Sequence, residues 1–246
     1  MTDFLESQNI FPLNMNFVTA DGDIGYHLTG LFPRRKYNVA QGVYPKKGWL
    51  LENLWLGHVD PKEHPRMYNP EKGYIVSANN FVASKNAKHG VTHAFSFTHR
   101  FIRLNELFDS RIKDKGYLNV QDMIDGQLDT VDLQAQLSTE YIIKNIEKGL
   151  ESALNITFKT NEAKKAKMRS MIMNSFKLWR DWNFAFELDQ IQASIYLAFD
   201  VAFATYFQET KIDNPDVRRG IHGNIIFDNF YYKEIHRWAD LTNPVQ

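Results

Sequence analysis

The chain has 246 residues, a formal net charge of zero and no cysteine, and this length suits one large domain or two small ones. The balance of 29 basic and 29 acidic residues argues against a nucleic-acid-binding protein, because neutralising phosphates requires a basic surplus. The absence of cysteine excludes disulfides, a thiolate nucleophile and cysteine-ligated metal centres.

Neither a membrane span nor a targeting signal is expected. The longest apolar stretch, residues 193–207, contains Asp200 and is shorter than the ~20 apolar residues that a spanning helix needs. The start of the chain has neither the basic region nor the apolar region of a signal peptide. The compartment is left open.

The first 35 residues predict a short helix followed by two strands. Residues 13–20 and 24–30 are the strands, and the Asp21-Gly22 pair between them is a strong hairpin signal. Strand alternation places Asn16 on one face, which suits a polar cleft, and Phe17 on the other, which suits a core. An isolated hairpin is marginal in water, so we expect the helices or another polypeptide to cover it.

Residues 36–99 predict loops, because neither a helical nor a strand period persists there. A loop stretch of this length is usually functional, or wraps another part of the protein. His89 and His93 are four residues apart and would share a metal on a helix, but the Gly90-Val91-Thr92 interval is a poor helix. We therefore assign no metal site.

Residues 100–210 predict helices. Apolar residues recur at three- and four-residue steps along 131–150 and 188–206, and a third helix is expected to start near Thr160. The fold class is α+β: residues 1–99 form a hairpin with wrapping loops, and residues 100–246 are mainly helical. We expect one continuous domain of a larger assembly.

Short motifs follow one another in a fixed order through residues 13–80. They are Asn16-x-x-x-Ala20-Asp21, Asp23-Ile24-Gly25-Tyr26, Thr29-Gly30, Pro33-Arg34-Arg35, Pro45-x-x-Gly48, Trp55-x-Gly57, Asn69-Pro70-x-x-Gly73-Tyr74-Ile75 and Ala78-Asn79-Asn80. This order resembles the penicillin acylase (penicillin amidase) family of N-terminal-nucleophile amide hydrolases. The resemblance implies that the complete protein is a four-layer αββα sandwich with a helical appendage.

The resemblance also implies a mechanism. In that family a serine, less often a cysteine or threonine, is exposed by self-cleavage at the start of the β-chain, and its own amine is the general base. An asparagine amide and backbone N–H groups stabilise the oxyanion. The matching residues here are Asn16 for the oxyanion and Arg35 for orienting the site, with Arg34 as the alternative. Calcium is expected only in the complete enzyme, and no ligand for it is assigned in this chain.

The sequence departs from the family in one important respect, because it contains no counterpart of the Ser-Asn strand that bears the nucleophile. Thr2 would follow a removed Met1, but it begins a predicted helix rather than a strand. We therefore expect this chain to resemble a C-terminal part of the β-chain, with the nucleophile and the rest of the sheet in another polypeptide. The alternative is an inactive family member that serves as a structural or assembly subunit. A free-standing helical binding module would leave the hairpin motifs unexplained.

Overall fold

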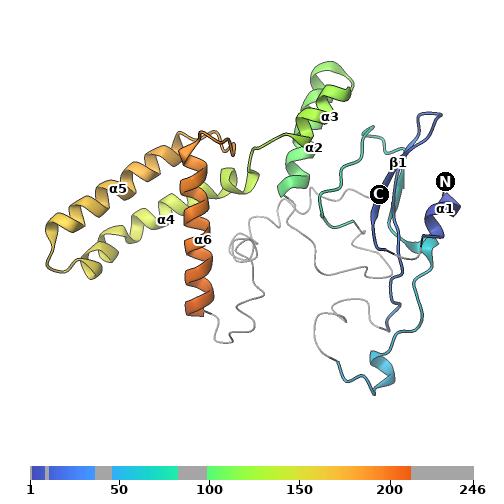
Figure 1. Cartoon of the computed structure of the whole chain (residues 1–246), viewed down its shortest axis with the longest axis horizontal. Helices are drawn as coiled ribbons and strands as arrows, with labels where there is room; N and C mark the ends of the chain where they lie inside the picture. Colours follow the sequence, from blue (N-terminus) through green and yellow to red (C-terminus); the bar gives the residue numbers. More distant parts are fainter. Residues whose placement is uncertain (1, 9–10, 37–45, 83–98, 212–246) are drawn as a thin grey trace. The chain divides into compact units, whose positions relative to one another are not determined.

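The computed structural model describes residues 2–8, 11–36, 46–82 and 99–211 (Figure 1). The chain divides into two compact units, one ending at Phe101 and the other beginning at Ile102. The first unit contains the sheet and the second contains most of the helices, so the architecture is the α+β mixture that the sequence predicts.

The first unit begins with the predicted short helix and hairpin. Helix α1 covers Thr2–Glu6, strand β1 covers Asn14–Val18, and strand β2 covers Ile24–Leu28. The hairpin turn is held because the Thr19 amide donates to the Asp23 carbonyl, 2.9 Å away. Gly22 has a φ of +90°, a conformation that glycine adopts without steric cost.

The prediction that residues 36–99 form only loops is wrong at one place. Strand β3, Arg66–Tyr68, pairs antiparallel with β2 and completes a sheet of order β1-β2-β3. Three residues are too few to show an alternating period. The strand is set by its flanks: the Asn69 side chain accepts a hydrogen bond from the Ile24 amide, and the Leu28 amide donates to the Pro65 carbonyl.

One row of side chains crosses the sheet from edge to edge. Asn16 stands opposite Tyr26, and Tyr26 stands opposite Met67, so the three side chains share a face. The same face packs the main apolar cluster of this unit, which is made of Tyr26, Leu28, Phe32 and Val59. The apolar core therefore lies on the face that carries Asn16, and not only on the Phe17 face that the sequence favoured.

The rest of the first unit is loop with two short 3₁₀ turns, Leu51–Asn53 and Pro61–Glu63. The second turn begins at Asp60, whose side chain accepts from the Lys62 amide with proline at the first position. These turns bring Val59 and His64 into the interior, where each is at most 4% exposed.

The helical unit is built from five helices among the described residues. They are α2 (His99–Lys115, which starts in the first unit), α3 (Val120–Gln127), α4 (Leu133–Thr157), α5 (Glu162–Arg180) and α6 (Ile191–Lys211). The predicted start of α5 at Thr160 is one residue early, because the Asn161 side chain accepts from the Lys164 amide and is the N-cap.

The core of the helical unit is aromatic. Helices α4, α5 and α6 pack together (Figure 1). They meet around Ile143, Trp179 and Tyr196, with Trp182 beside them. The Trp182 indole N–H donates to the Ala185 carbonyl at 3.0 Å, which fixes the chain between α5 and α6. None of the helices in the described ranges is long and apolar enough to cross a membrane.

Candidate functional site

Asn16 lies on the outer edge of the sheet. The hydrogen bonds of Thr29 to Leu13 and of Thr19 to Asp23 fix the ladder between β1 and β2. In an antiparallel ladder the paired residues alternate, so the backbone groups of Asn16 and its second neighbours point away from β2. No strand among the residues described here pairs with that edge. Asn16 therefore offers its side chain on the core face and its backbone to an incoming strand.

The neighbouring asparagine has a different position. The Tyr26 hydroxyl donates to Oδ1 of Asn14 across 2.7 Å. Tyr26 is only 6% exposed, and burial raises the pKa of its hydroxyl, so this group stays protonated as a donor. Asn14 and Asn16 are both exposed on the same face, and the Asn14 amide oxygen accepts from the hydroxyl of the buried Tyr26.

The two candidate arginines are also distinguished by their contacts. The Arg34 guanidinium donates from Nε and Nη2 to the Leu56 carbonyl, at 3.2 and 3.0 Å, and so holds the loop. The Arg35 guanidinium instead lies over the Trp55 ring, 5.7 Å from its centroid. Arg34 thus donates to a backbone carbonyl. Arg35 instead contacts the Trp55 ring with its guanidinium face, a contact that does not use its N–H donors.

A second asparagine–arginine arrangement lies where the sequence assigned no role. The Arg100 Nη2 atom donates to Oδ1 of Asn79 at 2.8 Å and to the Ala78 carbonyl at 3.3 Å. Because a guanidinium only donates, it selects the oxygen end of the amide and turns Nδ2 of Asn79 away from itself. Both side chains are exposed.

Asn79 lies in a tight turn that is held by hydrogen bonds of the neighbouring residue, Asn80. Asn79 has a φ of +58°, a left-handed conformation that asparagine adopts more readily than most residues other than glycine. The next residue, Asn80, is 5% exposed, accepts from the Ala78 amide at 3.0 Å and donates to the Phe81 carbonyl. Asn80 thereby closes the turn that presents Asn79.

The sequence contained only part of the signal for this pair. The Ala78-Asn79-Asn80 motif was visible, but its partner Arg100 lies 21 positions further on, in the predicted helical zone. No spacing rule connects a turn asparagine with an arginine in the first turn of a later helix. Only the fold brings them together.

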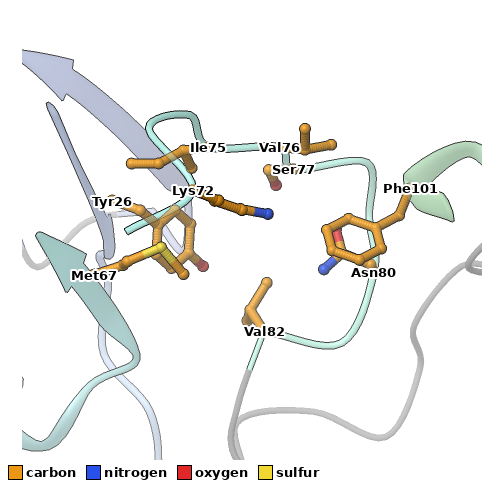
Figure 2. A pocket seen from close by; sticks show the side chains of 9 residues that line it. All are labelled: Tyr26, Met67, Lys72, Ile75, Val76, Ser77, Asn80, Val82 and Phe101. Carbon is orange, nitrogen blue, oxygen red and sulfur yellow. The ribbon is translucent and has the colours of Figure 1, made fainter. Parts of the chain in front are cut away.

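A small hollow adjoins this pair (Figure 2). Its lining residues are Tyr26, Met67, Lys72, Ile75, Val76, Ser77, Asn80, Val82 and Phe101. The space open to the centre of a water molecule is about 30 Å³, enough for roughly two water-sized groups. Tyr26 and Met67 belong to the cross-sheet row of Asn16, so the hollow lies between that row and the turn that presents Asn79.

Two histidines are buried near the sheet, and no metal is assigned to them. His27 and His64 are 2% and 4% exposed, with ring centroids 6.1 Å apart. Within the described ranges, no three His, Asp or Glu side chains lie together as a metal-binding group. His89 and His93 lie outside the described residues.

Comparison with known proteins identifies the family. A family model described as penicillin amidase matches residues 1–244, which is nearly the whole chain. The chain belongs to the penicillin amidase family, and the resemblance seen in the sequence motifs is confirmed.

Curated relatives are acylases. The chain is 32% identical over 109 residues to acyl-homoserine lactone acylase QuiP of Pseudomonas fluorescens, a match that covers 44% of this chain and 13% of the relative. The corresponding protein of Pseudomonas aeruginosa is 29% identical over 105 residues, covering 42% of this chain and 12% of the relative. The match therefore spans about an eighth of the length of these relatives.

A solved structure has the same fold. The thermostable penicillin G acylase from Alcaligenes faecalis superposes with a TM-score of 0.56 at 20% identity, covering 89% of this chain and 37% of that chain. At this identity the likeness shows the fold. The chain corresponds to little more than a third of that acylase chain.

Proposed function

We propose that this chain is the part of a penicillin-amidase-type hydrolase that supplies the side-chain oxyanion donor, while an N-terminal nucleophile lies in another segment or chain. The reaction is hydrolysis of a linear amide bond to an acid and an amine. Membership of the family and the acylase relatives support an acyl amide as the substrate class.

The observation that carries this proposal is the hydrogen bond from Arg100 to Asn79. An oxyanion donor must be aimed before the reaction, because reorientation in the transition state would cost part of the gain. The guanidinium fixes the Asn79 amide through its oxygen and polarises it, so that Nδ2 is the better donor. The geometry therefore favours Asn79 as the donor and Arg100 as its positioning residue.

Asn16 is kept as the alternative donor, with Arg35 as the orienting arginine. In its favour, Asn16 shares the cross-sheet row with Tyr26 and Met67, which line the hollow. Against it, its side chain is exposed at the open strand edge, and among the described residues it makes no hydrogen bond that would orient its amide.

The nucleophile is proposed to lie on a strand that joins the sheet beside β1. The outward backbone groups of Asn14, Asn16 and Val18 provide the pairing edge for such a strand. An open edge of this kind is an aggregation liability unless another strand covers it. The partner is thus another polypeptide segment with a free N-terminal serine, cysteine or threonine.

The test is purification of the native assembly, followed by intact-mass analysis of every chain and assay with an acyl anilide. The proposal predicts amine release by the assembly, none by this chain alone, and a co-purifying chain that begins with the nucleophile. An assembly that contains such a chain but never releases amine would favour the alternative, an inactive family member with a structural role. Turnover by this chain alone that tracks its purification would contradict the proposed division of the site.

A further inference from the structure

We propose that residues 49–56 form a docking surface for the polypeptide that carries the nucleophile, and that the matching surface of this partner is apolar and bordered by carboxylates. The proposal rests on the proposed function for the identity of the partner, which is taken to lie outside this chain. The docking surface itself is defined by the exposure, the hydrogen bonds and the charges of the described residues.

The docking surface is a run of large apolar side chains that are exposed to solvent. Six of its eight residues are tryptophan or leucine, and all six are exposed: Trp49, Leu50, Leu51, Leu54, Trp55 and Leu56. Trp49 is 79% exposed, Leu51 is 82% exposed and Trp55 is 61% exposed. Exposed leucines that are scattered singly are ordinary, whereas large apolar side chains gathered in one place mark an interaction site.

The loop that carries the docking surface is held by hydrogen bonds. Within the loop, the Asn53 side chain donates to the Lys47 carbonyl at 3.0 Å. At its end, the Leu56 amide donates to the Arg34 carbonyl at 2.7 Å, and the Arg34 amide donates to the Gly57 carbonyl at 2.9 Å. The apolar side chains are therefore presented by an ordered loop, which reduces the conformational entropy lost when a partner docks.

The charges beside the docking surface favour an acidic partner. Lys46 and Lys47 precede it directly, and both are exposed. Arg34 borders its other end, where the guanidinium donates to the loop backbone. Glu52 is the one acid in the sequence of residues 46–56. Carboxylates around the apolar patch of a partner would therefore be attracted to this border, and basic groups there would be repelled.

The same charges disfavour two other occupants. Because both ends of the run are basic, a two-fold contact with a second copy of the chain would bring like charges together. An anionic membrane would meet Glu52 within the apolar run, where the carboxylate is repelled by the lipid charge and is costly to bury. A polypeptide can instead place a lysine or an arginine opposite Glu52.

The size of the acylase fold also favours a polypeptide. This chain covers 37% of the solved acylase chain that shares its fold. The larger part of that acylase therefore has no counterpart in this sequence. A polypeptide of that size is large enough to cover the docking surface in addition to the open edge of β1.

The test is hydroxyl-radical footprinting of Trp49 and Trp55, read by mass spectrometry, in the native assembly and in the isolated full chain. We expect both indoles to be oxidised at least tenfold more slowly in the assembly. Leu51→Ser should raise the dissociation constant of the assembly about tenfold, because the leucine side chain no longer contributes to burial. Leu188→Ser is the matched control: it removes an exposed leucine of the helical unit and should leave the dissociation constant unchanged.

Equal oxidation of both indoles in the assembly and in the isolated chain would overturn the proposal, as would a folded Leu51→Ser variant that assembles like the wild type. In the case of equal oxidation, protection of the isolated chain at rising concentration assigns the surface to a second copy. Protection by vesicles of phosphatidylcholine and phosphatidylglycerol assigns it to a membrane instead.

Footprinting needs no turnover, so it separates this proposal from the proposed function. Protected indoles in an assembly that never releases amine would contradict the proposed hydrolysis and leave the docking surface standing. Exposed indoles in an assembly that does release amine would contradict the docking surface alone.

Discussion

The Arg100 guanidinium donates from Nη2 to the Oδ1 atom of Asn79, 2.8 Å away, and so decides which end of that amide is available to a substrate. Neither residue is buried, and the contact is therefore not a device for stabilising a core. Combined with the positive φ of Asn79, it gives a donor that is aimed by the fold rather than by the ligand.

Arg100 acts through Asn79, so its replacement should affect turnover more than binding. Arg100→Lys and Arg100→Ala in the assembled hydrolase should lower kcat about tenfold, the loss expected for one charge-assisted hydrogen bond, with little change in KM. The double variant with Asn79→Ala should lose hardly more than Asn79→Ala alone, because the two residues act as one unit. Fully additive losses in a double-mutant cycle would contradict this coupling.

The open edge of β1 predicts a pattern of amide hydrogen exchange. In the isolated chain the amides of Asn16 and Val18 should exchange fast, while those of Met15 and Phe17, which face β2, should be protected. In the native assembly the two outward amides should become protected as well. Equal rates for Asn16 in the isolated chain and in the assembly would show that no strand joins this edge.

Gly25 is required where the ring of Phe17 crosses the hairpin. A Cβ atom at position 25 would lie 2.1 Å from Cζ of Phe17, its cross-strand partner. Gly25→Ala should therefore destabilise the sheet unit by about 1–3 kcal/mol, because the ring must leave its place. Urea unfolding measures the change, with Gly48→Ala as the control, since an added Cβ there meets no atom of the described residues within 4 Å apart from its chain neighbours. A stability of Gly25→Ala equal to that of the control would contradict the contact.

The buried histidines predict acid sensitivity. Burial lowers the pKa of His27, with the neighbouring His64 and Arg66 adding to the shift and Glu6 opposing it. Burial likewise lowers the pKa of His64, opposed by its bond to the Leu28 carbonyl and by the charges of Asp60 and Glu6. Each ring is held neutral in the folded state.

The sign of the effect follows from linkage. Below the ordinary histidine value of 6.5 the unfolded chain binds more protons than the folded one, so stability is full above that pH and falls as the pH drops through it. His27→Phe removes two buried ring nitrogens that lack a well-aligned hydrogen bond to the described residues, and it should flatten this fall. Hydrogen exchange of the β2 amides measures this loss of stability. It is followed between about pH 7.5 and 5, because histidine ordinarily titrates in that range. An unchanged pH profile in His27→Phe would contradict the assignment.

The local elements could be predicted from the sequence because their signals are local. The Asp21-Gly22 pair predicts the hairpin, and the apolar periods predict α4 and α6. Strand β3 could not be predicted, because three residues show no period and the strand forms only through pairing with β2. The Asn79–Arg100 pair was missed for a related reason: it depends on a tertiary contact over 21 positions.

The motif order identified the family and, by resemblance, predicted Asn16 as the oxyanion donor. Asn79 was visible only as part of the Ala78-Asn79-Asn80 motif, and no role was predicted for it from the sequence. What distinguishes the two residues is the hydrogen bond from Arg100 to the amide oxygen of Asn79, a contact that only the fold supplies. Asn14, a third amide in the same region, also has its oxygen bonded, but to the neutral Tyr26 hydroxyl rather than to a cation.

The most direct test of the account is kcat of the assembled hydrolase with Asn79→Ala beside Asn16→Ala, using Val18→Ala, on the same strand face as Asn16, as the control for damage to the edge strand. Circular dichroism should show all three variants folded, since each side chain is exposed. The account predicts that Asn79→Ala lowers kcat by ~10²–10³, as expected for a lost oxyanion donor, while Asn16→Ala and Val18→Ala cost less than about tenfold. Wild-type kcat in a folded Asn79→Ala variant would contradict it, and a large loss confined to Asn16→Ala would transfer the role to that residue.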